Sequence, residues 1–204
     1  MINWKDLRYL QAGNSRQQQA YAVLQTLELW STLADFDPVL AGTIPLAIDT
    51  PASDLDVLCE VAPAAQQVFS HLLAARYGAL PAFRIRQHRI RGEDSIVCSF
   101  RYEDTEVEVF GQAVPTVQQF GFRHMLVEHA ILQAGGETWR YAVRQLKEQG
   151  LKTEPAFAAL LHLPGNPYES LLTLEGKTPA ELVAYLARCP LSREVQANTL
   201  LSLE

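Results

Sequence analysis

The sequence of 204 residues predicts an α+β fold, in which a mixed β-sheet with flanking helices is followed by a helical C-terminal region. Residues 54–61 alternate with period two, which predicts a strand with two distinct faces. Residues 83–110 hold three strand-like runs joined by short turns, which predict antiparallel pairing. After Gly111 the pattern is helical. We therefore expect a core with an N-terminal helix over residues 1–112 and a helical region over residues 113–204.

The first third of the chain alternates between helix and strand. A helix over residues 16–33, capped at Asn14 or the next residue, precedes a short buried strand over residues 39–41. The stretch 44–53 is irregular and contains two prolines, and it leads into the strand over residues 54–61. This order places two strand ends on either side of one loop.

The remaining elements follow from turn and capping signals. Pro63 begins a helix that Gly78 stops. The three antiparallel strands cover residues 83–90, 95–102 and 105–110. Helices are then expected over residues 116–133 and 137–149, after Thr153, from Thr178 to about 188, and after Ser192.

Composition and charge restrict the class of protein. Hydrophobic residues make up 48% and charged residues 20%, which is typical of a globular protein with its own core. The net charge of −6 argues against a long nucleic acid as the default partner. Three cysteines far apart indicate a reducing cytoplasmic setting. We expect neither a signal peptide nor a membrane partner, because the sequence shows no long apolar run.

Two aspartates stand two residues apart on the strand over residues 54–61. Asp54 and Asp56 should therefore project from one face, with Cα atoms about 6.5 to 7 Å apart. Neighbouring carboxylates repel each other unless a cation lies between them, and Mg²⁺ prefers carboxylate and phosphate oxygens. The pair predicts a centre for two-metal phosphoryl or nucleotidyl transfer.

Two further features complete the predicted site. Gly42 lets the backbone approach a ligand, and Thr43 adds a hydroxyl, so this turn can cradle the phosphates of a nucleoside triphosphate. A third carboxylate should come from a neighbouring strand, where Glu108 is flanked by valines and Glu106 lies near a turn. We expect Asp54 and Asp56 to hold the metals, and Glu108 to complete the shell and take the proton from the attacking hydroxyl.

The string Gly42-Thr43, ten residues, then Asp54-Leu55-Asp56 resembles the signature of the nucleotidyltransferase superfamily that includes polymerase beta. Its spacing is closest to that of the minimal nucleotidyltransferases. The resemblance covers about residues 38–110 and implies a small mixed sheet with flanking helices, Mg²⁺ and a nucleoside triphosphate. Threonine replaces the usual serine at position 43, but the hydroxyl is retained.

A wider set of residues resembles an uncharacterised bacterial family of nucleotidyltransferase-like proteins, which brings a domain of unknown function and no known substrate. The resemblance rests on residues 40–45, 53–56, 107–112 and 123–125.

The predicted function is a Mg²⁺-dependent nucleotidyltransferase that moves a nucleoside monophosphate from a triphosphate to a hydroxyl and releases pyrophosphate. The acceptor is a small molecule, a protein or an RNA end, and the sequence does not say which. The alternative is a non-catalytic module that binds a nucleotide or a protein, for example a toxin–antitoxin-type partner.

Two other groups of residues are weaker candidates. Arg84, Arg86 and His88 alternate on one strand face, where they could contact a triphosphate or a polyanionic acceptor; a solvated strand edge is the favoured interpretation. His124 and Glu128 share a helix face, and a satisfied structural histidine is favoured over a phosphate contact. Their spacing does not fit a zinc protease motif.

Overall fold

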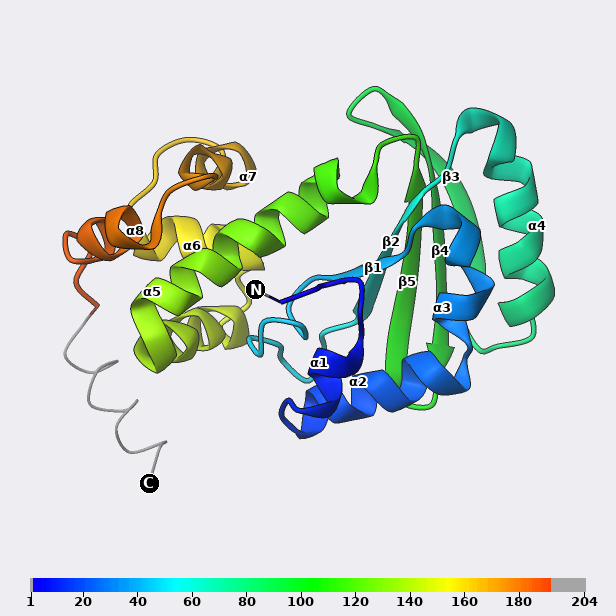
Figure 1. Ribbon diagram of the computed structural model, residues 1–204, viewed down its shortest axis with the longest axis horizontal. Helices are drawn as coiled ribbons and strands as arrows, with labels where there is room; N and C mark the ends of the chain where they lie inside the picture. Colours follow the sequence, from blue (N-terminus) through cyan, green and yellow to red (C-terminus); the bar gives the residue numbers. More distant parts are fainter. Residues whose placement is uncertain (1, 192–204) are drawn as a thin grey trace. The chain divides into compact units, whose positions relative to one another are not determined.

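The computed structural model describes residues 2–191, and the chain forms two compact units (Figure 1). The first comprises Met1–Pro45 and Ser53–Phe122, and the second comprises Leu46–Ala52 and Arg123–Glu204. The short helix expected after Ser192 lies outside the described residues.

The first unit contains a five-stranded sheet in the order β1-β2-β5-β4-β3. β2 and β5 are parallel, and the other neighbours are antiparallel. The strands are β1 (Val39–Ala41), β2 (Leu55–Glu60), β3 (Arg84–Ile90), β4 (Glu93–Tyr102) and β5 (Thr105–Gln112). The five predicted strands are therefore present, and the sheet is mixed as expected.

Helices cover one face of this sheet (Figure 1). The buried core on that face takes alternate residues of the strands, such as Leu55 and Val57 of β2, and packs them against apolar helix residues. The helical segments of this unit are α1 (Arg8–Gln11), α2 (Ser15–Thr26), α3 (Leu29–Thr32), η1 (Ala34–Phe36), η2 (Pro63–Ala65), α4 (Gln66–Tyr77) and η3 (Thr116–Gln118).

The single helix expected over residues 16–33 is wrong in one respect, because it is divided at Glu28. Glu28 has φ of 52°, in the left-handed region, and separates α2 from α3. Leu27 and Leu29 are both buried. Residues two apart do not face the same way on a continuous helix, so the break allows both to enter the core. The Leu27 carbonyl accepts a hydrogen bond of 3.1 Å from the Tyr77 hydroxyl.

The second unit is helical within the described residues, apart from its irregular segment Leu46–Ala52 and the connecting loops. Its elements are most of α5 (Phe120–Glu148), then α6 (Thr153–Leu160), α7 (Pro167–Ser170), η4 (Leu171–Leu174) and α8 (Pro179–Leu186). Gly136 has non-helical angles of 66° and −159°, so α5 is two helices across a kink, as the Gly135-Gly136 pair predicts. The capping box of Thr178 and Glu181 is present at the start of α8.

The segment that leads into α5 belongs to the first unit. Gln119 donates to the carbonyl oxygen of Cys59 at 2.8 Å, and Thr116 donates to Asp37 at 2.7 Å. These bonds hold the chain to the sheet up to Phe122, beyond the boundary after residue 112 that the sequence suggests. None of the described helices has the length and apolarity required to cross a bilayer.

Candidate functional site

Two carboxylates stand side by side on neighbouring parallel strands. Asp56 of β2 is opposite Glu108 of β5 in the register, and both residues are half-buried. Leu55 and Val57, which flank Asp56, belong to the core. Side chains alternate along a strand, so Asp56 and Glu108 project from the face away from the core. Neighbouring strands lie about 4.8 Å apart, a separation at which two carboxylates can share one cation.

Asp54 lies immediately before β2 and is also half-buried. The strand itself begins at Leu55, so the expected projection of Asp54 from the same face as Asp56 stays a prediction. On β5, Glu106 is exposed whereas Glu108 is half-buried in the middle of the strand. This difference agrees with the choice of Glu108 over Glu106 as the third carboxylate.

The glycine turn after β1 lies directly against the Asp56 carboxylate. Gly42 has φ of 78°, and a Cβ atom at this position would lie 2.3 Å from Asp56 Oδ2. Glycine is thus required here twice, by the backbone conformation and by the close approach of a side chain. The predicted proximity of the Gly42 turn and Asp56 is present in the fold.

A hydroxyl pair closes the loop between β1 and β2. Thr43 Oγ1 lies 3.2 Å from Ser53 Oγ, so the two ends of the loop are bonded to each other. Arg16 of α2 donates to the Ser53 carbonyl oxygen at 2.9 Å. Sequence reasoning identified Thr43 but missed Ser53 and Arg16. A serine directly before Asp54 was the available signal for the first, and the contact of Arg16 spans 37 positions without any local signature.

The first turn of α2 also holds the start of this loop. The Gln17 side-chain amide donates to the carbonyl oxygens of Ile44 and Pro45, at 3.0 and 3.1 Å. Its oxygen accepts from the Asn14 backbone N–H at 3.0 Å, within a capping box. One buried glutamine therefore fixes both the helix start and the chain just after Thr43.

We expect Gln17→Ala to lower the free energy of unfolding by about 2 to 3 kcal/mol, because two buried carbonyl groups and one helix cap lose their partner. Chemical denaturation of the full chain measures this change. Gln18→Ala is the matched control, since Gln18 is an exposed glutamine of the same helix whose amide bonds the Gly13 carbonyl oxygen at 2.8 Å. Equal losses in the two variants would contradict the assigned role of Gln17.

The Glu108 carboxylate affects the pKa of a buried thiol, that of Cys98. Burial, and then the nearby Glu108 carboxylate, raises the pKa of Cys98 to about 12. Cys98 is paired with Val109, the residue after Glu108, and is fully buried. This thiol is therefore a core residue, and the anionic group of this part of the sheet is Glu108.

The carboxylates suit Mg²⁺ through their donor chemistry. Within residues 2–191, no three His, Cys, Asp or Glu side chains form a group that could hold a metal ion. Protein-bound Mg²⁺ commonly takes only one or two carboxylates and fills its shell with phosphates and water. Asp56 and Glu108 provide such a pair, and Asp54 is adjacent in the chain. The residues present fit a magnesium ion that is shared with a triphosphate.

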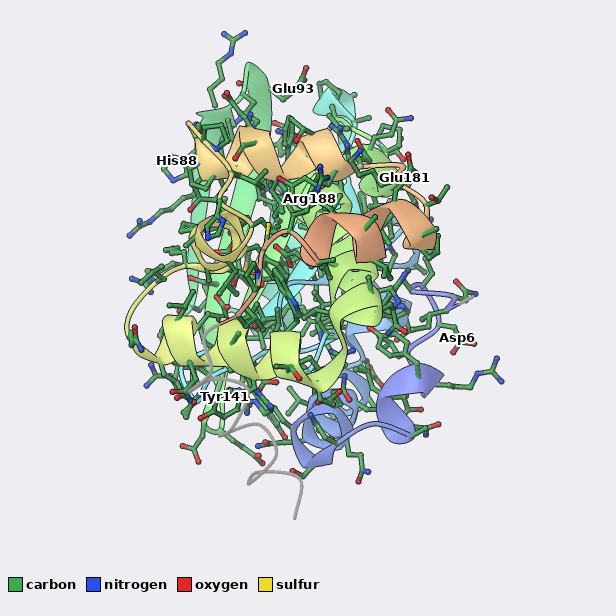
Figure 2. The ribbon with its side chains drawn as sticks, turned by 90° about the vertical axis from the view of Figure 1, so that its left-hand side faces the viewer. Asp6, His88, Glu93, Tyr141, Glu181 and Arg188 are labelled. Atoms are coloured by element: carbon green, nitrogen blue, oxygen red, sulfur yellow. The ribbon has the colours of Figure 1, made fainter. Side chains whose placement is uncertain are left out.

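Three alternate residues of β3 lie on the same face as the carboxylates. Arg84 is opposite Ser99 of β4, and Ser99 is opposite Glu108. Arg86 and His88 follow at alternate positions, and all three β3 residues are exposed. Figure 2 shows the His88 side chain pointing outward from the strand.

The candidates in the second unit make structural contacts. Arg123 forms two hydrogen bonds with Glu175, at 3.0 and 2.6 Å. His124 is 4% exposed, and its Nε2 donates to the Tyr168 carbonyl oxygen at 2.7 Å. Its Nδ1 lies 3.3 Å from a carboxylate oxygen of Glu154. These contacts agree with the favoured interpretation of His124 as a satisfied helix residue.

Glu128 is a buried carboxyl group beside this cluster. It is 3% exposed, and burial, with the nearby Glu154 charge, raises its pKa from 4.5 to about 8, whereas Lys147 acts in the opposite direction. The folded chain therefore keeps a proton on Glu128 that the unfolded chain releases near pH 4.5. The folded state binds more protons between these two values, so stability falls as the pH rises from about 5 to 8.

We expect Glu128→Gln to remove this loss and to exceed the wild type in unfolding free energy at pH 8 by about 2 to 4 kcal/mol. At pH 5 the two proteins should be nearly equal. Denaturation at both pH values measures the difference, with Glu148→Gln, an exposed residue of the same helix, as the control. The lowered pKa of Glu154 acts only below its ordinary value of 4.5, outside this window. Parallel pH profiles for wild type and Glu128→Gln would refute the assignment.

Comparison with solved structures shows which known proteins have a similar fold. The chain is similar to the Cid1 poly(U) polymerase with MgGTP bound, with a TM-score of 0.50 and 11% identity over 81% of this chain and 53% of that chain. It is similar to a cytoplasmic RNA terminal U-transferase, with a TM-score of 0.53 and 12% identity over 74% and 50%. It is also similar to the GLD-2/RNP-8 complex, with a TM-score of 0.51 and 10% identity over 86% and 78%.

These likenesses concern the fold. The chain spans about half the length of the first two structures. The mixed sheet, its flanking helices and the helical C-terminal region match a nucleotidyltransferase-like α+β fold, which confirms the predicted fold class.

Sequence comparison assigns the family. No curated protein sequence matches the chain. Residues 22–174, well over half of the sequence, match the model described as Domain of unknown function (DUF4269). That description gives neither an activity nor an organism, so the expected bacterial origin stays a prediction. The chain belongs to the DUF4269 family.

Proposed function

We propose that this protein is a Mg²⁺-dependent nucleotidyltransferase. The observation that carries the proposal is the position of Asp56, whose carboxylate lies against the Gly42 turn and opposite Glu108, on the face of the sheet away from the first unit's core. Like charges opposite each other on neighbouring strands are unfavourable without a cation. The arrangement is explained by a function that brings a cation and phosphates to this position.

The phosphate side of the proposed site is the loop between β1 and β2. Gly42 has no side chain, so the turn lies directly against the Asp56 carboxylate, where metal-bound β and γ phosphates would lie. The Thr43 hydroxyl donates to Ser53 Oγ, and on nucleotide binding it would turn this proton to a phosphate oxygen. Arg16 and Gln17 position the loop from the start of α2. The loop is thereby set in place before a nucleotide arrives, which reduces the entropy lost on binding.

The carboxylates provide the metal and proton side. Asp54, Asp56 and Glu108 would hold Mg²⁺, which when bound supplies neutralisation of phosphate charge. In the reaction, the acceptor hydroxyl oxygen bonds to the α-phosphorus, the bond between the α and β phosphates breaks, and pyrophosphate leaves with the bonding electrons. The proton of the attacking hydroxyl passes to the Glu108 carboxylate.

The solved structures with a similar fold support the type of reaction that we propose. One similar structure is a poly(U) polymerase with MgGTP bound, and another is an RNA terminal U-transferase. An RNA end is therefore one acceptor to test for this chain, beside a protein and a small molecule. The GLD-2/RNP-8 structure is a complex, so a partner protein is a further possibility to include.

Incubation of the full chain with Mg²⁺ and each of four α-labelled nucleoside triphosphates tests the proposal. Acceptors are short RNA, a protein extract and a metabolite extract, and both label transfer and pyrophosphate release are measured. We expect transfer to one acceptor class, and a chelator should abolish it. Binding of triphosphate with no pyrophosphate release from any acceptor pool would reject the enzyme and favour a non-catalytic nucleotide-binding module.

A further inference from the structure

The edge strand β3 carries three side chains without partners, which we call the β3 strip: Arg84, Arg86 and His88. All three are exposed, and within residues 2–191 no hydrogen bond, ion pair or ring contact engages them. Three other exposed cations of the described chain pair with acidic side chains: Lys5 with Asp37, Arg8 with Asp6 and Arg76 with Glu28. The β3 strip differs from these because its three cationic or titratable side chains follow one another on one face of an edge strand.

The strip is limited to one face of the strand. Arg89, which alternates to the opposite face, donates to the Gly92 carbonyl oxygen at 3.0 Å. Arg91 in the adjoining turn lies over the Phe120 ring, 3.8 Å from its centroid. The neighbouring arginines therefore have contacts within the chain, and the β3 strip stands apart from them.

The strip and the carboxylates share the face of the sheet away from the core. Arg84 is in line with Ser99 and Glu108, and Arg86 is in line with Val97 and Phe110. On this face β4 places Ser99, Val97 and Ser95 between the strip and β5, and its carboxylate on this face, Glu93, is opposite Ile90 at the end of the strand, beyond the strip. Small side chains lie between the acidic strands and the cationic edge.

The strand order separates the strip from the phosphate-binding turn. Gly42 follows β1 at one edge of the sheet, and the strip is on β3 at the other edge. Four strand spacings, about 19 Å, separate these edges, whereas two spacings, about 10 Å, separate the strip from Glu108. A triphosphate held at Gly42 and Asp56 is too far away to be the ligand of the strip. In the strand order, Glu108 on β5 therefore lies between the Gly42 turn and the strip.

The chemistry of the strip fits a short phosphodiester chain. Guanidinium groups pair with phosphate oxygens in bidentate geometry. Alternate residues of a strand are about 6.6 Å apart, comparable with successive phosphates of an extended single strand, and the strip is about 13 Å long. It can therefore engage two or three phosphates. The net charge of −6 is unfavourable for a long duplex but tolerates a short flexible end.

We propose that the β3 strip binds the phosphate backbone of a single-stranded nucleic-acid acceptor and directs its terminal hydroxyl towards Glu108. This inference rests on the proposed nucleotidyl transfer and names the acceptor class for it. Arg84, on the row of Glu108, holds the phosphate closest to the reacting end, and Arg86 and His88 hold the preceding ones.

Fluorescence anisotropy of a labelled twelve-nucleotide RNA with the full chain tests the proposal, in Mg²⁺ and without triphosphate. The double variant Arg84→Ser with Arg86→Ser should bind about 10-fold more weakly, whatever the RNA sequence. The slope of log affinity against log salt should fall by about 1.4, because two phosphate contacts are lost from a single strand. Arg89→Ser, which removes the same charge from the opposite face of β3, should stay within about twofold of wild type.

Unchanged RNA binding in the double variant, or no RNA binding by the wild type, overturns the inference. Displacement of the RNA probe by an acidic peptide at equal concentration also overturns it, in favour of a protein partner. Asp56→Asn separates the two proposals: it should bind RNA like wild type and lose transfer. RNA binding that depends on Arg84 and Arg86, without transfer from any triphosphate, would reject the proposed function and leave the nucleic-acid surface supported.

Discussion

Replacement of Asp56 by asparagine is expected to lower the rate of nucleotidyl transfer about 1,000-fold, because one negative oxygen of the proposed magnesium site is lost while the shape of the side chain is kept. A loss of that size corresponds to about 4 kcal/mol in the activation free energy. We expect this large loss of rate because Asp56 is central in the proposed site: it lies against the Gly42 turn on one side and is opposite Glu108 on the other.

The same substitution should leave the fold intact. Asp56 is half-buried and opposite Glu108 on the neighbouring strand, and like charges in such a position disfavour each other. In a chelator, Asp56→Asn should therefore unfold at the wild-type temperature or slightly above it. Added Mg²⁺ with a triphosphate should raise the melting temperature of the wild type far more than that of the variant.

Initial rates of label transfer and thermal melts of both proteins provide the measurements. Glu60→Gln is the matched control, because Glu60 is an exposed acidic residue at the end of the same strand. Its transfer rate should stay within about twofold of wild type. An Asp56→Asn rate within tenfold of wild type would remove the carboxylate from the proposed centre.

The sequence predicted those parts of the candidate site whose signals are local. Asp54 and Asp56 belong to one alternating run, and Gly42 interrupts an apolar run, so spacing alone indicated each of them. The flanking valines of Glu108 separated it from Glu106, and the exposure of Glu106 agrees. The sequence did not predict that β2 and β5 are parallel neighbours. Pairing between strands about fifty residues apart is decided by the fold as a whole.

The residues that sequence reasoning missed act over long separations. Gln17 and Arg16 look like ordinary polar residues at a helix start, and their bonds to Ile44 and Ser53 have no pattern in the chain. The break at Glu28 was missed for a similar reason, since its cause is the burial of the leucines on both sides. Helix propensity favours continuity there, and packing overrides it.

Gly42→Ala is expected to reduce transfer about 100-fold through a displacement of the Asp56 carboxylate, since a shift of about 1 Å at a reacting centre has an effect of that size. The added Cβ would lie 2.3 Å from Asp56 Oδ2, so the carboxylate must move. The φ of 78° adds a backbone cost of about 1 to 2 kcal/mol in stability.

Gly92→Ala distinguishes the two effects. Gly92 has φ of 88°, and a Cβ there would meet no atom within 4 Å. The two variants should therefore lose similar stability in denaturation, and only Gly42→Ala should lose transfer. An equal loss of transfer in the two variants would mean that backbone strain causes the whole loss. The contact between the Gly42 turn and Asp56 would then have no part in the reaction. A loss confined to Gly42→Ala would tie the glycine turn to the carboxylate, because the strain is common to both variants and the contact is not.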